Sequence, residues 1–421
     1  PEPLHLDRIE PGYHARFADG RTVDVYGDAD AMAAEVARTS GAAEAVRYRR
    51  MRGWLGEVFD AEFDRFMAAN FDSPLDLVAT RSARSDLLRL ARLGGFGRLG
   101  PRIERFVHDD ELARLFTFQA LYAGVAPARA LAVYAAIPYL DTCLGVWFPR
   151  GGMRAIAHSM AAALQSAGGK VEYGTEVTGI DVEGRRARGV RTRTGRLDCD
   201  ALVVTADLGT LPELGLPVRR GLRASPSAVV ALGTIPVEIS AAWPAQAHHT
   251  IDFGAAWAQT FAEITARRGR GRLMSDPSLL ITRPAATDPG QYIDRGSRRY
   301  EPLSVLAPCP NLDSAPLDWT ALGPAYQREV LQVLEARGYR GIAEHFTVDR
   351  LDTPHSWHTQ GMLAGTPFSA AHLFRQTGPF RTRNLIPGKD NVVLAGSGTT
   401  PGVGVPTVLL SGKLAAERIT G

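Results

Sequence analysis

The stretch from Asn391 to Glu417 constrains the fold of this chain more than any other part of it. After its first residue, Asn391–Gly396 is continuously apolar or small, as strands buried inside a parallel sheet are. A glycine-rich loop follows, and the residues from Thr407 onward have helical composition. Glycine lets bare backbone approach a flat or phosphorylated ligand, and a helix start points unpaired N–H groups at it. The spacing alone leaves two interpretations open, a ligand-binding loop and an ordinary strand–turn–helix.

This loop resembles the C-terminal flavin-contacting segment of the phytoene desaturase family of carotenoid-forming enzymes. The family pattern is Gly-x-Gly-Thr-x-Pro-Gly-x-Gly-x-Pro, and Gly396–Pro406 matches it, with Thr400 where many relatives carry His. The likeness covers nearly the whole chain, and its other specific pieces are Trp147–Gly152, His248–Thr250, Leu306–Pro310 and Asp318–Thr320.

The resemblance implies an FAD cofactor and a set of residues that contact it. A flavin gains negative charge when it is reduced, so a helix N-terminus aimed at the ring favours reduction. In the middle of the chain, the residue after Glu176 is expected to lay its backbone on the adenine. The implied contact residues are Val177, Gly396, Thr399, Gly402, Val403, Gly404, Val405, Pro406 and Thr407.

The implied fold is an α/β (α+β) two-domain flavoprotein. We expect a discontinuous Rossmann-like FAD domain over 147–207 and 385–421, in which Ala201–Ala206 and Asn391–Gly396 share a sheet. A mixed-sheet substrate domain is expected over 1–40 and 211–384. A helical, membrane-facing cap is expected over 41–146.

Local patterns predict further elements. Asp28 is placed to cap a helix over Ala29–Arg38, Lys170–Tyr173 reads as a strand, and Arg188–Cys199 reads as a hairpin. Gly95–Gly100 matches the dinucleotide fingerprint Gly-x-Gly-x-x-Gly letter for letter. That fingerprint requires a buried strand before it, whereas an arginine-rich helical pattern precedes it here, so we reject this match.

The composition excludes several classes of protein. A formal net charge of +3 on 421 residues is too small to argue for a nucleic-acid partner. Cys143, Cys199 and Cys309 are far apart, which excludes a disulfide framework or a zinc site and favours a reducing cytoplasm. The longest apolar run, Ala130–Leu140, contains Pro138 and is shorter than the roughly 20 residues that a membrane span needs.

The segment Arg81–Arg105 is basic and amphipathic, with seven arginines set among leucines. Such a segment can lie in a membrane interface, or it can be a solvated helix face packed on the protein. The family's substrate is a long polyene hydrocarbon, so the resemblance implies peripheral contact with the inner face of the cell membrane. The family begins with a dinucleotide-binding unit of about 30 residues that nothing here matches, so we expect this sequence to be N-terminally incomplete.

The implied reaction is FAD-dependent desaturation of phytoene or a related carotenoid precursor. One hydrogen leaves as hydride to the flavin and the other as a proton, which demands orientation more than strong acid–base groups. Asp141 is a weak candidate for the base, because the pattern favours a capping or salt-bridged carboxylate there, and His158, His248 and His249 are interpreted as structural. Alternatives are a carotenoid oxidase, ketolase or isomerase, an amine oxidase on the same scaffold, or a non-catalytic lipid-binding protein without flavin.

Overall fold

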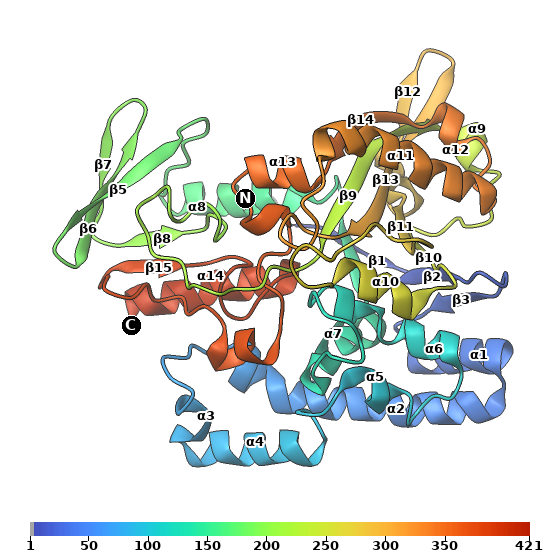
Figure 1. The fold of residues 1–421 in the computed structure, drawn as a ribbon, viewed down its shortest axis with the longest axis horizontal. Helices are drawn as coiled ribbons and strands as arrows, with labels where there is room; N and C mark the ends of the chain where they lie inside the picture. The colour runs from blue at the N-terminus through green and yellow to red at the C-terminus, as the bar shows by residue number, and fades with distance from the viewer. Residues whose placement is uncertain (1–3) are drawn as a thin grey trace.

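The computed structural model describes residues 4–421. An eight-stranded sheet is the largest sheet among these residues (Figure 1). The strand order is β14–β9–β13–β11–β10–β2–β3, with β12 beside β13. Neighbouring strands are antiparallel except β10 and β2, which are parallel, so the predicted mixed sheet is confirmed. The strands are β2 (Tyr13–Arg16), β3 (Thr22–Val25), β9 (Ser227–Pro236), β10 (His249–Asp252), β11 (Leu279–Thr282), β12 (Ile293–Arg295), β13 (Arg298–Cys309) and β14 (Thr347–Asp352).

The alternation of side chains along β13 explains how the sheet packs. From Tyr300 to Ala307, half-buried and buried residues alternate, because successive side chains of a strand point to opposite faces. The buried face packs with α11 (Trp319–Ala336), and Val305 and Leu331 belong to the same core cluster. Shorter helices border this half of the molecule: α9 (Val237–Ser240), α10 (Trp257–Ile264), α12 (Ile342–His345) and α13 (Pro354–Thr359).

Helices from the region 41–146 pack on the β2–β3 end of the sheet (Figure 1). One core cluster joins Ala15 and Val23 of the sheet to Tyr48 and Leu55 of the long helix α2. As predicted, Asp28 caps the first helix, because its carboxylate accepts from the N–H groups of residues 30 and 31. The helices are α1 (Ala29–Ser40), α2 (Ala42–Glu62), α3 (Asp76–Ala79), α4 (Arg81–Arg92), α5 (Leu99–Ile103), α6 (Asp110–Leu115) and α7 (Ala136–Tyr139), and π-helical turns follow α2 (Phe63–Met67) and α7 (Leu140–Leu144).

A second, smaller region holds the C-terminal strand. β15 (Val392–Leu394) pairs in parallel with β8 (Leu202–Val204), so the prediction that these two segments share a sheet is confirmed. Asn391 fastens this pair to the neighbouring three-stranded sheet, because its amide exchanges hydrogen bonds of 2.8 Å with the backbone of Ala187. That sheet consists of β5 (Val177–Glu183), β6 (Arg186–Thr192) and β7 (Arg196–Asp198), and the C-terminal helix is α14 (Val405–Thr420).

Two local predictions have clear outcomes. The strand expected at Lys170–Tyr173 is wrong, because in the described chain no strand pairs with it and it leads irregularly from α8 (Arg154–Ser166) into β5. The rejection of the Gly95–Gly100 match is confirmed, because helix α4 and a turn precede it rather than a strand. Two further strands, β1 (Leu6–Ile9) and β4 (Val146–Pro149), pair with each other.

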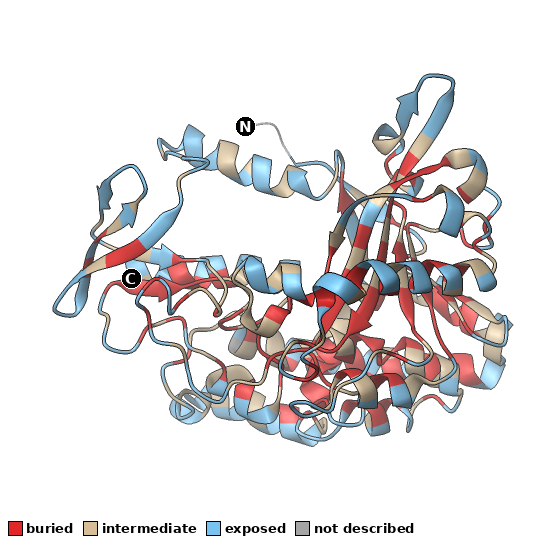
Figure 2. Ribbon diagram, turned by 45° about the horizontal axis from the view of Figure 1, so that its top comes forward, coloured by how far each residue is buried: buried red, intermediate tan, exposed pale blue. Residues whose placement is uncertain are grey.

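Buried residues are more frequent in the region of the large sheet than in the smaller region. Figure 2 shows buried residues gathered in the large sheet, its helices and β15, whereas α8 and the β5–β7 sheet are mostly exposed. The domain boundaries expected from the sequence stay a prediction, and residues 1–3 of the first range lie outside the described residues.

Candidate functional site

The loop between β15 and α14 has the backbone that its glycines predict. Gly396, Gly402 and Gly404 have φ angles of 110°, 144° and 116°, a region that other residues rarely adopt. Gly404 caps α14 with no side-chain hydrogen bond to the first turn. Since a helix leaves its first N–H groups without intrahelical partners, this helix start carries free donors and a partial positive charge.

A buried arginine from an irregular segment holds this loop in place. Arg381 is 3% exposed and donates to the carbonyl oxygens of Thr399, at 2.8 Å, and Ser397, at 2.6 Å. Burial disfavours the cation and lowers the pKa of Arg381 to about 10, so the side chain stays charged at neutral pH. Sequence reasoning missed Arg381, because it lies in a segment with no periodic pattern and 16 to 18 positions from its partners.

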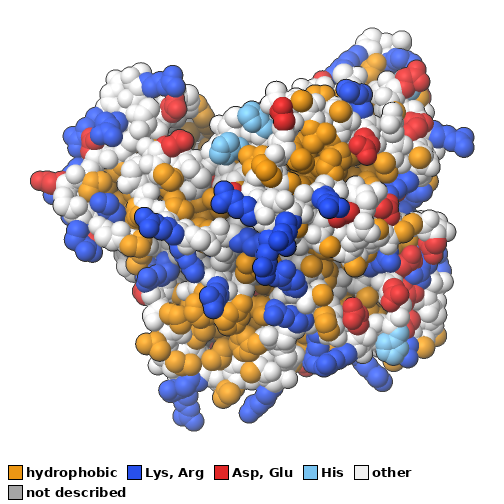
Figure 3. Space-filling view, in the orientation of Figure 1, with side chains coloured by type: hydrophobic (Ala, Val, Ile, Leu, Met, Phe, Trp, Pro, Cys, Tyr) orange, Lys and Arg blue, Asp and Glu red, His pale blue; other side chains and the backbone are white. Residues whose placement is uncertain are grey.

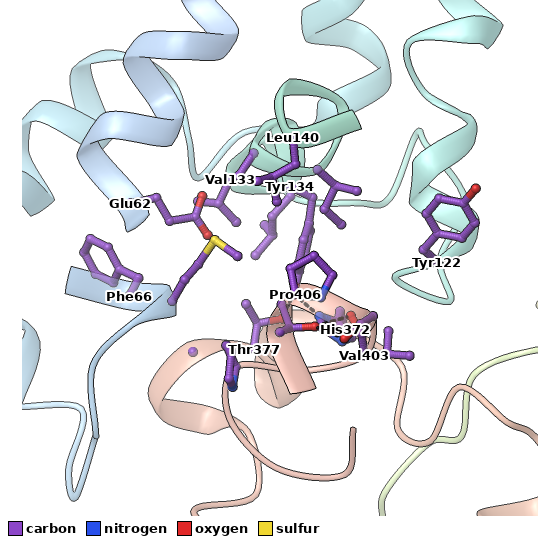
Figure 4. Close-up of a pocket in the computed structure, with 18 of the residues that line it drawn as sticks. Glu62, Phe66, Tyr122, Val133, Tyr134, Leu140, His372, Thr377, Val403 and Pro406 are labelled. Carbon is purple, nitrogen blue, oxygen red and sulfur yellow. Dashed lines mark hydrogen bonds between the residues drawn. The ribbon is translucent and has the colours of Figure 1, made fainter. Parts of the chain in front are cut away.

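The loop forms one wall of a large apolar cavity of about 660 Å³, which we call the main cavity. This volume is in the range of about 300–1,000 Å³ typical of small-molecule sites. Val403 and Pro406 line it on one side, and Val133 and Leu140 face them from the α7 region (Figure 4). Its far ends are marked by Glu62 and Tyr122, which come from different helical segments (Figure 4).

The structure divides the residues predicted to contact the cofactor into three groups. Val403, Gly404, Pro406 and Thr407 line the main cavity. Gly396 and Thr399 instead support the loop: the N–H of Gly396 donates to Ser411 at 2.7 Å, and the hydroxyl of Thr399 donates to the carbonyl of residue 382 at 2.9 Å. Outside the cavity wall lie Gly402, the half-exposed Val405 and Val177, the last of these at the start of β5 in the separate three-stranded sheet.

An imidazole lies directly behind the loop. A Cβ on Gly402 would collide with the ring of His372, which supplies a protein-side reason for glycine at this position. The Nδ1 of His372 and the hydroxyl of Tyr134 are 3.0 Å apart, and that hydroxyl also lies 2.6 Å from the Thr377 hydroxyl. Burial and the nearby Arg381 hold the pKa of His372 well below its usual value, so the ring is neutral. The loop position where many relatives carry His is Thr400 here, and the fold brings an imidazole to the loop from elsewhere.

Two carboxyl groups face the cavity without a cationic partner among their hydrogen bonds within the described chain. Asp141 Oδ2 accepts from the Tyr13 hydroxyl at 3.2 Å and from Gln119 at 3.3 Å, while Oδ1 is buried and unpartnered. Glu62 Oε2 is likewise buried and unpartnered. Burial disfavours the charged form and raises the pKa of both groups to about 8. No ion pair of the described chain involves Asp141, and its role as a base or as a structural carboxyl stays a prediction. Glu62 was missed because a lone Glu at a helix end carries no sequence signal.

The histidines interpreted as structural lie outside the main cavity. His248 and His249 bond to Thr287 and Thr282 through Nδ1, at 2.8 and 3.0 Å. Burial lowers their pKa values to about 4 and about 3. His158 is exposed on α8.

The residues around the loop fit a flavin. The buried Nε2 of His372 has no partner in the described chain, and the helix start at Gly404 offers free N–H donors. With the buried charge of Arg381 they form a positive, hydrogen-bonding environment, which suits a ring that becomes negative when it accepts electrons. Val403, Gly404, Pro406 and Thr407 would hold the ring on the cavity side.

Comparison with known proteins supports this fit. The model of the flavin-containing amine oxidoreductases matches residues 55–420. The chain is 53% identical to a phytoene dehydrogenase of Streptomyces griseus, over 99% of this chain and 80% of that protein. It is 29% identical to a zeta-carotene-forming phytoene desaturase of Myxococcus xanthus, over 99% of this chain and 79% of that protein. A crystal structure of an oxidoreductase from Methanosarcina mazei shares the fold, with a TM-score of 0.57 at 12% identity, over 99% of this chain and 82% of that one. The chain therefore belongs to the flavin-containing amine oxidoreductase family and, within it, to the phytoene desaturases, and it is an FAD-dependent oxidoreductase.

Proposed function

We propose that this protein introduces C=C bonds into phytoene or a related linear carotenoid precursor. The observation that carries the proposal is the main cavity of about 660 Å³, lined chiefly by apolar side chains and walled on one side by the flavin-type loop. A long hydrocarbon offers no polar group to recognise, so such a cavity binds it by excluding water. The relatives named as phytoene dehydrogenase and phytoene desaturase support the same substrate class.

The chemistry places few demands on protein side chains. Bound FAD supplies the acceptor for the two electrons that leave the substrate with one hydrogen. The cavity walls hold the chain against Val403 and Pro406 and keep water away from the electron-poor carbon that develops. What the protein must still provide is a place for the proton from the neighbouring carbon.

We assign that proton to Asp141. Its Oδ2 is fixed by Tyr13 and Gln119, which leaves the buried Oδ1 free to receive a proton. With a pKa of about 8, the carboxyl is mostly protonated at neutral pH and becomes a base as the pH rises. Turnover is therefore expected to increase with pH through this value.

We infer that the main cavity opens beside α3 and α4, which supports a peripheral contact with a membrane. Leu77, Leu87, Leu90 and Phe96, from α3, α4 and the turn after them, line this end. In the same region Leu75, Leu88 and Phe96 are 72%, 57% and 46% exposed. Figure 3 shows hydrophobic side chains gathered over α3 and α4 with basic side chains at the margin.

This arrangement suits an amphipathic surface that lies on anionic headgroups. Among the described helices, none is long and apolar enough to cross a bilayer. We assign the contact to the inner face of the cell membrane, where a hydrocarbon substrate would be collected and where free cysteines such as Cys143 and Cys309 persist.

The test is product analysis with the FAD-loaded protein and phytoene held in liposomes of anionic lipid. New absorption bands at longer wavelength and a loss of two hydrogens per step in the mass spectrum would support the proposal. An isomerised product of unchanged mass would favour the isomerase alternative, and added oxygen would favour an oxidase or ketolase. Phytoene bound but unchanged, together with rapid oxidation of an amine, would refute desaturation.

A further inference from the structure

A second cavity adjoins the inner end of the main cavity. It has a volume of about 100 Å³, and we call it the inner cavity. Leu121, Ile251, Phe253 and Trp257 are among the apolar residues that line it. Only Tyr122 and Phe368 belong to the walls of both cavities, so these two aromatic rings form the partition between them in the described structure.

The partition is held from both sides. Tyr122 packs edge-to-face against Phe118, with ring centroids 5.6 Å apart and an interplanar angle of 79°. Phe118 is itself in edge contact with Phe253, at 6.3 Å. Across the gap, the backbone of Phe368 is tied by an N–H bond to the Thr366 hydroxyl, at 3.2 Å. The ring of Tyr122 is therefore positioned by its aromatic neighbours, and the backbone that carries Phe368 is fixed by its turn.

The partition lies at the opposite end of the cavity from its mouth. Figure 4 places Tyr122 on one side of the drawn residues and Glu62 and Phe66 on the other, with Pro406 between them. Helix α4, which contributes Leu87 and Leu90 to the lining, packs on α2, whose last residue is Glu62, so we take this end as the mouth. A linear molecule that enters at this end passes the loop and then meets the partition.

We propose that Tyr122 and Phe368 set how far a linear polyene enters, and thereby which of its C–C bonds lies against the loop. This inference rests on the proposed function. A conjugated or methyl-branched chain cannot fold up in a narrow apolar cavity, so its leading end stops where the wall stops it. The reacting position is fixed by the loop, so the depth of entry decides how many carbons separate the reacting bond from the leading end.

Opening the partition joins the inner cavity to the main one. The leading end then advances beyond Tyr122, and the bond that faces the loop lies further from that end and closer to the centre of the substrate. The inner cavity is apolar, so the advance also removes more hydrocarbon from water, which favours the deeper position.

The test compares Tyr122→Ala and Phe368→Ala with wild type in the FAD-loaded protein. Leu121→Ala is the matched control, because Leu121 lines the inner cavity but not the main one, so the partition stays closed. In the partition variants we expect the ratio of centrally to terminally desaturated products to change by about tenfold, the scale that small changes of an apolar pocket give. Leu121→Ala should keep the wild-type ratio.

A second measurement separates this proposal from the proposed function. Binding of a C30 and a C40 isoprenoid hydrocarbon is measured by displacement of a fluorescent fatty chain. The partition variants should gain affinity for the longer chain relative to the shorter one, also if phytoene proves not to be the substrate. If alanine prevents folding, Tyr122→Leu and Phe368→Leu provide smaller openings. Unchanged product ratios and unchanged length preference in folded variants would overturn the proposal.

Discussion

Replacing Glu62 by glutamine tests the electrostatics of the main cavity most directly. The Glu62 carboxyl is buried without a partner for Oε2, and burial raises its pKa from 4.5 to about 8. In the unfolded chain the group ionises near its ordinary value. Between these two values the unfolded state carries the charge and the folded state holds the proton, so the free energy of unfolding falls as pH rises across this window.

The magnitude follows from the two pKa values. Each unit of difference corresponds to about 1.4 kcal/mol, so the shift from 4.5 to about 8 costs the folded state at most about 5 kcal/mol above this window. At about pH 7 the cost is about 3 kcal/mol, and at about pH 5.5 it is about 1 kcal/mol. Glutamine keeps the shape and cannot ionise. Glu62→Gln should therefore stabilise the protein by an amount that grows from about 1 kcal/mol at about pH 5.5 towards about 5 kcal/mol at alkaline pH.

The assay is urea unfolding of wild type and variant at about pH 5.5, 7 and 8.5, with the free energies compared at each pH. The exposed Glu57 lies on the same helix, so Glu57→Gln is a matched control that should show no such trend. A difference between Glu62→Gln and wild type that stays flat from about pH 5.5 to 8.5 would refute the reasoning, because water in the cavity would then be solvating the carboxylate.

Wild-type turnover should rise about tenfold between about pH 7 and 9, as Asp141 ionises with its pKa of about 8. Asp141→Asn should lose this pH dependence and about 100-fold in rate, whereas an unchanged profile would exclude Asp141 as the base. Arg381→Met should weaken flavin binding, so that flavin is lost on ultrafiltration, because the carbonyls of the loop lose their charged donor. Full retention of flavin would show that the loop keeps its conformation without Arg381. Exchanging the exposed Arg89, Arg92 and Arg98 for glutamate should weaken binding to anionic liposomes by about 1 kcal/mol per charge, measured by co-sedimentation. The flavin content should not change. Equal pelleting of wild type and variant would place the membrane contact elsewhere.

The apolar cavity and its protonated acids belong together. At neutral pH a pKa of about 8 leaves Glu62 and Asp141 mostly uncharged, and burial keeps His372 neutral. A hydrocarbon therefore meets a wall with little charge to desolvate. The charge of Arg381 lies behind the loop, where the guanidinium donates to backbone carbonyls instead of facing the substrate.

What the sequence determined by itself is local. The apolar run before Gly396, the glycines of the loop and the cap at Asp28 each specify their geometry within a few residues, since φ angles and first-turn hydrogen bonds depend on near neighbours. The same locality explains the error at Lys170–Tyr173, where a strand-like composition finds no partner strand in the described chain.

Only the tertiary structure decided the chemistry of the cavity. Tyr13 and Asp141 bond across 128 positions, and His372 and Tyr134 across 238. Their altered pKa values come from burial among distant segments, which no window of sequence encodes. The partition at Tyr122 arises in the same way, because this ring separates two cavities whose other walls come from distant segments of the chain.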